Sequence, residues 1–476
     1  MIPADKRVAV LGLGYVGLPM ASLCASAGYE VVGFDLDVAL VDRLSKRQCP
    51  IRDDAVESML SAAVTSGRLA FSTKVDDIAD ASVYLVCVPS PVDSRNEPDL
   101  APLLGACRSI GSRLGQGDLV VIETTVYPGI CEQVVLPLLE ELSGLVAGDT
   151  FYLAHCPERV NPGDPFWHSG NIPRVIGATC RSGLDLAAEF YASILGGGTL
   201  DVRGVRRGLY PKFRDGENGL QVSHVALGSI TRMNSIRDAE AVKAMENTVR
   251  DVNIAFVNEL AKISDALGLD VVDIIDGMAT KPFGKGPFYP GVGVGGHCIA
   301  IDPEWLRAAS ERAGYIPEMI QLARTINNGM PEYTASILQD LLNQRGYPLK
   351  DTGVAILGVA YKRNVDDPRE SPYYPLRDIL LAKGARLSVY DSWVPLENTA
   401  ASVDECLQGC KAIVIVTEHS DIIEQLRTMN LHESGIEVVV DGRNCLDGDA
   451  LTASNILYRG IGRRAPEVVM TDPGVS

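Results

Sequence analysis

A cysteine follows directly after a glycine-rich stretch, in the segment GVGVGGHCIAIDP that runs from Gly291 to Pro303. This residue, Cys298, is followed four positions later by Asp302. Glycines allow the backbone to come close to another group, and a cysteine thiolate is a nucleophile. The segment is therefore either a tightly packed turn or the place of a reactive thiol. A cysteine beside a glycine turn is usually structural, so Cys298 must be judged together with its surroundings.

The spacing G-x-G-x-x-G, typical of dinucleotide-binding loops, occurs twice in the sequence. Its first occurrence, at Gly12, Gly14 and Gly17, follows the apolar strand pattern RVAVL and opens a helical pattern. In such a loop the first glycine forms the turn, the second admits the pyrophosphate and the third lets the helix pack on the strand. The second occurrence, at 291–296, follows the Pro- and Gly-rich stretch KPFGKGPFYP instead of a strand. We therefore predict a cofactor loop only at the first place, where the alternative is a glycine turn without a ligand.

An acidic residue ends the second predicted strand. The pattern EVVGFDLD predicts this strand, and Asp35 lies at its end, about 20 residues after the glycine loop. A carboxylate at this place binds the ribose hydroxyls of the cofactor and repels a 2′-phosphate. The sequence therefore predicts that the cofactor is NAD and not NADP.

A long helical pattern covers residues 237–268 and ends at a glycine. Lys243 and Asn247 lie four residues apart in this pattern and hence on one face of the helix. An ammonium and an amide that point together suit an alkoxide or a tetrahedral oxyanion, although a lysine in a helix is more often a solvated charge. The helix also has more apolar residues than one buried face requires, so we expect it to pack against its own copy in a dimer. These residues are Val249, Val252, Phe256, Val257 and Leu260.

The overall composition is that of a globular protein with more than one domain. The chain has 476 residues, of which 46% are hydrophobic and 22% are charged, and its formal net charge is −18. This acidity argues against a nucleic acid or an anionic membrane as the partner, so the cations that hold an anionic substrate must be local. The eleven cysteines include no C-x-x-C pair and the six histidines form no ligand cluster, so we expect reduced thiols and no metal site. No apolar stretch is long enough to span a bilayer.

Strand and helix patterns alternate at both ends of the chain. Further strands are predicted at VYLVCV and LVVIET, and a second series, GVAILGV, RLSVYD, KAIVIV and EVVVDG, begins after about residue 346. We therefore predict an α/β fold with a Rossmann domain at 1–200, a helical domain at 236–330 and a second Rossmann-like domain at 331–476. The polar segment between the first two, 201–235, is predicted to be an inserted surface loop.

Seven segments together resemble the successive signatures of the UDP-glucose/GDP-mannose dehydrogenase family. In chain order they are GLGYVGLP, CVPSP, ETTVYPG, CPERVNPG, AVKAMENTVRDVNIAFVNEL, GVGVGGHCIAIDP and LGVAYKRNVDDPRESP. The resemblance implies an N-terminal NAD-binding domain, a central helical dimerisation domain and a C-terminal domain that binds a UDP-sugar. It also implies a cytoplasmic homodimer or higher homo-oligomer of polysaccharide biosynthesis. Its reaction would be the four-electron oxidation of the C6 alcohol of a nucleotide sugar to a carboxylate, with two NAD⁺ consumed.

The same resemblance implies a catalytic set. A thiolate at Cys298 can attack the C6 aldehyde to give a thiohemiacetal and then a thioester, so that one site carries out both oxidations. Glu158 resembles the general base for thioester hydrolysis, and Asp302 resembles the aspartate that positions water or adjusts Lys243. The full set is Cys298, Lys243, Asn247, Asp302, Glu158 and Thr125.

Binding residues are implied in the same way. Thr125 resembles the threonine that contacts both the cofactor and the catalytic water, and Arg369 an arginine that reaches the cofactor from a neighbouring subunit. Lys362 would neutralise the pyrophosphate of the sugar nucleotide, as an acidic protein requires. The cofactor set is Gly12, Gly14, Tyr15, Val16, Gly17, Asp35, Ser90, Thr125 and Arg369. The substrate set is Arg159, Val160, Lys243, Asn247, Arg250, Tyr289, Gly291, Gly295, Tyr361 and Lys362.

A few positions indicate the sugar. His297 and His419 resemble the UDP-N-acetylhexosamine branch of the family, whereas the UDP-glucose and GDP-mannose branches commonly have serine at the first position and tend to have tryptophan at the second. Within that branch, Pro282 and Gly284 stand where the N-acetylmannosamine enzymes carry a His-x-Arg pair. UDP-N-acetylglucosamine is therefore the favoured substrate.

Three departures from the family pattern leave alternatives open. LSKRQCP replaces a short N-x-G turn, Ala300 replaces a frequent proline, and the segment from about Leu200 to Ser229 has no clear counterpart. Another acceptor sugar, plain UDP-glucose among them, or another assembly is compatible with these differences. A two-electron oxidoreductase could dispense with Cys298, and a non-catalytic sugar-nucleotide sensor would need neither Cys298 nor Glu158.

Overall fold

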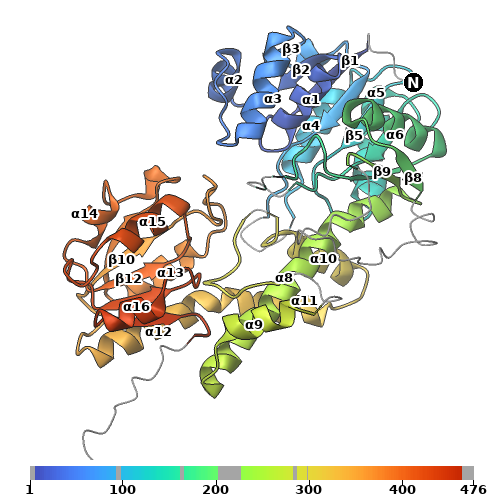
Figure 1. Ribbon diagram of the computed structural model, residues 1–476. Coiled ribbons are helices and arrows are strands. Elements are labelled where there is room, and N and C mark those ends of the chain that lie inside the picture. Colours follow the sequence, from blue (N-terminus) through green and yellow to red (C-terminus); the bar gives the residue numbers. More distant parts are fainter. Residues whose placement is uncertain are drawn as a thin grey trace, which may run out of the picture. The chain divides into compact units, whose positions relative to one another are not determined.

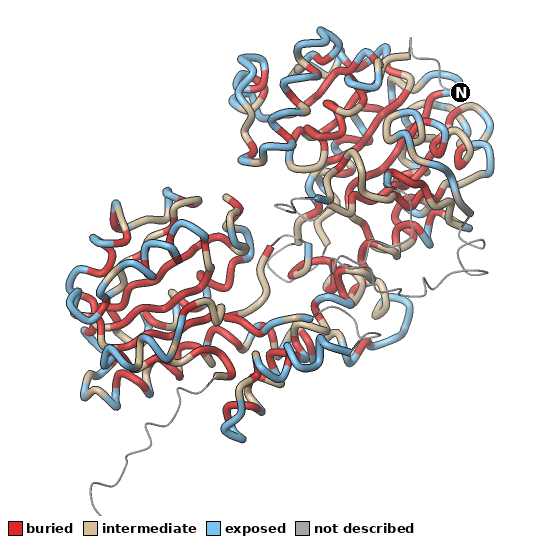
Figure 2. The backbone as a smooth tube through the Cα atoms, in the orientation of Figure 1, coloured by how far each residue is buried: buried red, intermediate tan, exposed pale blue. Residues whose placement is uncertain are grey.

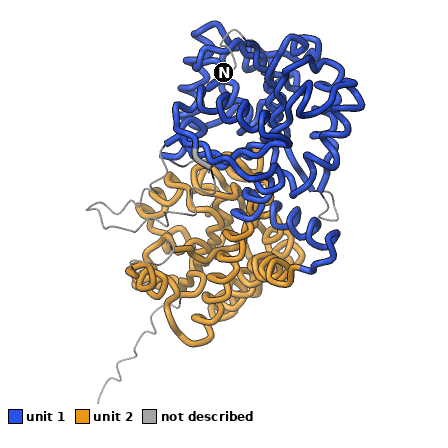
Figure 3. Tube along the Cα trace, turned by 90° about the vertical axis from the view of Figure 1, so that its right-hand side faces the viewer, with its two compact units in different colours: residues 1–247, 301–316 blue, residues 248–300, 317–476 orange. Residues whose placement is uncertain are grey.

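The computed structural model describes residues 6–92, 98–160, 164, 166–201, 227–281, 287–296 and 298–463. The chain divides into two compact units (Figure 3). Unit 1 comprises residues 1–247 and 301–316, and unit 2 comprises residues 248–300 and 317–476. These limits do not coincide with the predicted segments, because the long central helix contributes to both units.

Unit 1 contains a nine-stranded sheet with the strand order β3-β2-β1-β4-β5-β6-β7-β9-β8. The first six strands are parallel and have the 3-2-1-4-5-6 order of a doubly wound dinucleotide-binding sheet. Strand β7 is antiparallel to β6, and β9 and β8 continue the sheet parallel to β7. The strands are β1 (Arg7–Leu11), β2 (Glu30–Phe34), β3 (Leu69–Ser72), β4 (Val83–Val86), β5 (Leu119–Ile122), β6 (Tyr152–His155), β7 (Arg174–Ala178), β8 (Thr199–Asp201) and β9 (Ile230–Arg232).

The central strands of unit 1 are continuous apolar runs because they are buried on both sides (Figures 1 and 2). Val8 and Val10 of β1 belong to a core that includes residues of α1, α3 and α6, whereas Ala9 and Leu11 are buried on the opposite side of the sheet. Helices α1 and α3 pack against each other, as do α4 and α5. The α-helices are α1 (Gly17–Ser26), α2 (Val38–Ser45), α3 (Asp54–Thr65), α4 (Ala101–Gly111), α5 (Leu136–Ser143), α6 (Arg181–Leu195) and α10 (Asp302–Arg312). A short 3-10 helix lies at Val75–Ile78 and a short π-helix at Cys131–Val135.

Helix α8 (Ile236–Leu267) confirms the long helix predicted over 237–268. The segment predicted as an inserted loop, 201–235, is only partly tested, since residues 202–226 lie outside the described part of the chain. Its two ends are not loop, because β8 and β9 pair with each other at the edge of the sheet of unit 1.

Unit 2 contains a parallel five-stranded sheet with the order β11-β10-β12-β13-β14, which is the 2-1-3-4-5 order of flavodoxin-like sheets. Val354 and Ile356 of β10 pack with α12 and α13, and Ala355 and Leu357 pack with α14 and α15. The strands are β10 (Gly353–Leu357), β11 (Arg386–Tyr390), β12 (Ala412–Ile415), β13 (Val438–Asp441) and β14 (Leu457–Gly460). The helices are α9 (Val271–Ala279), α11 (Glu318–Asn328), α12 (Met330–Gln344), α13 (Tyr373–Ala382), α14 (Val403–Leu407), α15 (Ser420–Thr428) and α16 (Gly448–Ala453), with a short 3-10 turn at Pro395–Glu397.

The predicted α/β class and the two Rossmann-like ends are confirmed by these sheets. All eleven cysteines lie within the described residues and none is joined in a disulfide. Among the helices described, none is long and apolar enough to cross a membrane.

Candidate active site

The N-terminal glycine loop joins β1 to α1, and its three glycines meet different requirements. Gly12 has a φ of +90°, and a Cβ atom there would lie 2.8 Å from the carbonyl oxygen of Cys87. A Cβ atom on Gly17 would lie 1.8 Å from the carbonyl oxygen of Gly12. Gly14 is exposed, and no described atom lies within 4 Å of its Cβ position. The fold itself therefore requires the first and third glycines, while the second leaves open space beside the backbone, as a pyrophosphate needs.

Asp35 follows β2 and lies beside this loop. Its Oδ2 accepts a hydrogen bond from the main-chain N–H of Leu13 (2.8 Å), and its Oδ1 accepts one from that of Asp37 (3.0 Å). Ser90 follows β4 and Thr125 follows β5, so both lie at the same carboxyl edge of the parallel strands. In sheets of this order ligands bind outside that edge, where the strand order reverses between β1 and β4. These residues fit NAD, whose phosphates the loop would hold and whose ribose Asp35 would bind.

Lys243, Asn247 and Asp302 form a buried polar cluster in unit 1. Asn247 Nδ2 donates to Asp302 Oδ2 at 2.5 Å and so joins α8 to the first residue of α10. Lys243 is only 7% exposed, so it is not the solvated charge that its sequence context alone favours. Burial raises the pKa of Asp302 to about 6, against the opposing effects of the Lys243 charge and the Asn247 hydrogen bond. This carboxyl group therefore titrates close to neutral pH, where a group can both take up and release a proton.

Glu158 lies after β6, and each of its carboxylate oxygens has partners. Oε1 accepts the main-chain N–H groups of Arg159 (2.7 Å) and Val160 (2.9 Å). Oε2 lies 2.7 Å from Nη2 of Arg174, the first residue of β7. Three donors from two segments thus fix the orientation of this carboxylate.

Arg174 belongs to a buried charge cluster that the sequence analysis missed. It is 0% exposed, and its Nη1 lies 3.7 Å from Oε2 of Glu123, which directly follows β5 and is also fully buried. Tyr191 on α6 donates a short hydrogen bond to the other oxygen of Glu123. The signal was present in the sequence, since a charged residue directly follows the apolar run LVVI and another directly precedes VIGA. Only the fold shows that the two charges face each other.

Arg159 and Arg250 were both predicted to hold the sugar nucleotide. Arg159 forms an ion pair with Glu246 on α8, to which both its Nε (3.1 Å) and its Nη2 donate, and its Nη1 donates to the carbonyl oxygen of Pro173 (3.1 Å). Arg250 lies exposed on the part of α8 that belongs to unit 2. The binding role of either arginine stays a prediction.

In unit 2, the glycines that precede Cys298 pack against Tyr361. A Cβ atom on Gly296 would lie 2.7 Å from the Tyr361 ring, and one on Gly295 would lie 2.8 Å from its Cβ. The N–H of Gly296 donates to the carbonyl oxygen of Arg369 (3.0 Å). Cys298 itself is exposed. The segment is therefore a packed turn with Cys298 exposed at its end. The stretch 281–290 was predicted not to be a strand, and residues 287–290, which are described, form none.

Tyr361 and Lys362 lie in the loop after β10. Burial, with smaller effects from the charges of Asp367 and Cys298, raises the pKa of Tyr361 to about 12. Arg369 pairs with Asp367 (Nη2–Oδ2 2.7 Å), so its predicted reach to a neighbouring subunit's cofactor is untested.

The other predicted substrate residues of unit 2 precede the turn. The N–H of Gly291 donates to Oδ1 of Asn258 (3.0 Å), and the hydroxyl of Tyr289 donates to Oδ1 of Asp276 (2.6 Å). His297, Pro282 and Gly284 lie outside the described residues. Among those described, no group of three or more His, Cys, Asp or Glu side chains is arranged to hold a metal ion.

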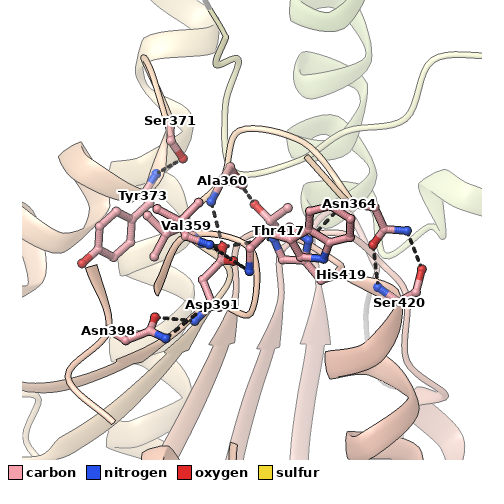
Figure 4. A network of polar contacts seen from close by, with 12 residues as sticks. Val359, Ala360, Asn364, Ser371, Tyr373, Asp391, Asn398, Thr417, His419 and Ser420 are labelled. Carbon is pink, nitrogen blue, oxygen red and sulfur yellow. Dashed lines mark hydrogen bonds and ion pairs between the residues drawn. The ribbon is translucent and has the colours of Figure 1, made fainter. Parts of the chain in front are cut away.

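The loop 358–364 is fixed from below by Asp391, which follows β11 and is fully buried (Figure 4). Asp391 Oδ2 accepts the main-chain N–H groups of Val359 and Ala360 (2.9 Å) and faces Nε2 of His419 at 3.0 Å. Burial alone would raise the pKa of Asp391, but the His419 contact and the two N–H donors outweigh burial and lower the pKa to about 2. Because this value lies below the ordinary 3.8, the carboxylate stabilises the fold above about pH 4, and this contribution is lost as the pH falls towards 2.

His419 holds the far end of the same loop (Figure 4). Its Nδ1 accepts the main-chain N–H of Asn364 at 3.0 Å. An accepting ring nitrogen carries no proton, so the proton of the neutral ring is on Nε2, which donates to Asp391. Asn364 has a φ of +55°, and its side chain exchanges hydrogen bonds with Ser420 (2.7 and 3.0 Å). His419 thereby couples the loop to the buried carboxylate.

The parallel sheet, the glycine loop and Asp35 define unit 1 as an NAD-binding domain of the dehydrogenase class. Sequence models of the UDP-glucose/GDP-mannose dehydrogenase family match the chain in three blocks: the NAD binding domain at 6–195, the central domain at 237–329 and the UDP binding domain at 355–448. The chain therefore belongs to this family and is an NAD-dependent oxidoreductase of nucleotide sugars, as its motifs predicted.

Individual relatives agree over nearly the whole chain. It is 34% identical to the UDP-N-acetyl-D-mannosamine dehydrogenase of Pyrococcus horikoshii over 96% of this chain and 99% of that protein. It is also 34% identical to the UDP-N-acetyl-D-glucosamine 6-dehydrogenase of Pseudomonas aeruginosa, over 83% of this chain and 84% of the relative. The solved structure of the UDP-D-ManNAc dehydrogenase from Pyrococcus horikoshii matches with a TM-score of 0.83 at 33% identity, over 96% of this chain and 99% of that one.

Two substitutions at His419 separate its contacts. An asparagine places its amide oxygen near the position of Nδ1 and can still accept the Asn364 N–H, whereas a glutamine reaches the position of Nε2 and cannot. We expect amide hydrogen exchange at Asn364 to rise roughly fivefold in His419→Gln, the effect of losing one hydrogen bond worth about 1 kcal/mol, and to stay near the wild-type rate in His419→Asn. Equal exchange in the two variants would contradict the assigned tautomer.

Proposed function

We propose that this protein oxidises the C6 alcohol of a UDP-N-acetylhexosamine to the uronic acid, with Cys298 as the nucleophile. The observation that carries the proposal is the buried cluster of Lys243, Asn247 and Asp302, in which an ammonium and an amide lie on one face of α8 beside a carboxyl group that titrates near neutral pH. Such a group of donors suits a developing oxyanion. The exposed thiol at the end of its packed turn supports the same chemistry.

UDP-N-acetylglucosamine is proposed as the first substrate, with UDP-N-acetylmannosamine next and UDP-glucose as the alternative. His419 and the absence of a His-x-Arg pair at Pro282 and Gly284 support this order. The relatives named above act on the two N-acetylated sugars, which differ only in configuration at C2. The kcat/KM values for these three sugars and GDP-mannose test the order directly, and a preference for UDP-glucose would contradict it.

Different residues of the chain carry out different steps of the proposed reaction. The glycine loop and Asp35 would hold NAD, which would supply the hydride acceptor for the two oxidations at C6. The Cys298 thiolate adds to the C6 aldehyde, and loss of hydride from the resulting thiohemiacetal leaves a thioester. Glu158 takes a proton from the water that attacks this thioester, so that the carbon–sulfur bond breaks and the thiol is restored. One alcohol and one water thus give a carboxylate, two hydrides and three protons.

Replacing Glu158 by Gln should separate oxidation from hydrolysis. The substitution keeps the shape of the side chain but removes the base, so both oxidations should occur once before the enzyme stalls. We expect a burst approaching two NADH per active site, followed by turnover slowed by about 10²–10⁴-fold. Intact-mass measurement should show one acyl sugar nucleotide on the peptide that contains Cys298.

Cys298→Ala is the control for this experiment. Without the thiol, neither the adduct nor the uronic acid should form. If the Cys298→Ala enzyme still makes the acid at close to the wild-type rate, the segment that contains Cys298 is only a packed turn and the covalent mechanism is wrong.

The proposed assembly is a homodimer formed through α8. Val249, Phe256 and Ile263 recur every seven residues along this helix and are 48%, 53% and 46% exposed, so they form one apolar stripe. A second copy packed with two-fold symmetry would bring the same stripe of both subunits together. Light scattering at micromolar concentration should show a dimer for the wild type and for Leu396→Glu, a control at a leucine that is 98% exposed elsewhere in unit 2. Phe256→Glu should give a monomer, and a wild-type monomer with full activity would refute the assembly.

A further inference from the structure

The buried guanidinium of Arg174 faces two carboxylates, although the proposed chemistry uses only one of them. Nη2 of Arg174 lies 2.7 Å from Oε2 of Glu158, and Nη1 lies 3.7 Å from Oε2 of Glu123. Arg174 and Glu123 are fully buried and Glu158 is 7% exposed. A charge removed from water is stabilised mainly by its partners, so the two carboxylates compete for one cation.

One tyrosine and three cysteines around Glu123 stay neutral near neutral pH. Tyr191 donates to Glu123 Oε1 from α6, and burial holds the pKa of its hydroxyl well above the ordinary value. Three thiols also face the cluster, those of Cys24 on α1, Cys87 after β4 and Cys156 after β6. Burial raises the pKa of each thiol, so all three remain neutral.

Glu123 differs from these groups. Burial raises the pKa of its carboxyl group, and the charge of Glu158 adds to the rise, while Arg174 and the Tyr191 hydrogen bond lower it. The balance of these effects leaves the pKa of Glu123 at about 7, so this carboxyl group changes its charge near neutral pH.

We propose that Glu123 is a positioning residue whose charge sets how tightly Arg174 holds Glu158, and thereby how readily Glu158 accepts a proton. This inference rests on the proposed role of Glu158 as the base for thioester hydrolysis. When Glu123 is neutral, the guanidinium attracts Glu158 alone and holds it tightly. When Glu123 is ionised, the guanidinium is shared between the two carboxylates and holds Glu158 less tightly. Hydrolysis therefore accelerates as the pH rises through the titration of Glu123.

The effect of Glu123 on hydrolysis is measured by the decay rate of the acyl-enzyme between pH 5.5 and 8.5. Rapid quenching and intact-mass measurement give this rate. We expect the wild-type rate to rise about three- to tenfold across neutral pH. A change in one neighbouring charge alters the proton affinity of a base by about tenfold, and only part of this change appears in the rate. Glu123→Gln imitates the neutral acid, so its rate should stay at the low-pH level throughout. Tyr191→Phe removes a donor that favours the ionised form, so its rise should move to higher pH.

Glu240→Gln is the matched control. Glu240 is a buried carboxylate of unit 1 whose partners are the main-chain N–H groups of Gly129 (2.5 Å) and Cys131 (2.7 Å). A loss of packing or stability would affect both Gln variants, whereas only Glu123→Gln should lose the pH-dependent rise. The NAD affinity of each variant shows that unit 1 is folded.

A wild-type pH profile in Glu123→Gln, alongside a stalled acyl-enzyme in Glu158→Gln, would overturn this inference and leave the proposed function intact. Normal turnover by Glu158→Gln would overturn both. An equal change of profile in Glu123→Gln and Glu240→Gln would assign Glu123 a structural role and also overturn the inference.

Discussion

A charged side chain taken out of water needs a partner, and this requirement fixes the polar geometry of unit 1. Asp302 is buried at the start of α10 because Asn247 donates to it and Lys243 lies beside it. Glu158 is buried because Arg174 faces it, and Arg174 in turn requires a second carboxylate. The buried charged groups on the carboxyl side of the sheet thus depend on one another for their positions.

The two Rossmann-like units have an aspartate at the same topological position, but the two aspartates have different roles. Asp35 and Asp391 both follow the second strand of their sheets and both accept N–H groups from the loop after the first strand. Asp35 is partly exposed, so its carboxylate can still meet a ribose. Asp391 is fully buried beneath His419, so its remaining capacity is used within the protein. The difference in burial thus leaves Asp35 available to a ligand and keeps Asp391 for the support of its own loop.

Local patterns in the sequence were sufficient to predict β1, the glycine loop, Asp35 and α8, because each depends on residues close together in the chain. They were also sufficient to place Lys243 and Asn247 on one face of a helix. They could not show that Lys243 is buried, or that Glu123 and Arg174 share one buried site, because these facts depend on strands brought together by the sheet. The pairing of β8 and β9 at its edge was missed for the same reason, since three-residue strands carry almost no periodic signal.

If this protein oxidises each sugar molecule twice, the stoichiometry of NADH formation must show it. The most direct measurement is the amount of NADH formed per nucleotide sugar consumed, with NAD⁺ in excess and the sugar product identified by mass. We expect a ratio of two, with the uronic acid as the product. A ratio of one with an aldehyde product, or no NADH at all, would contradict it.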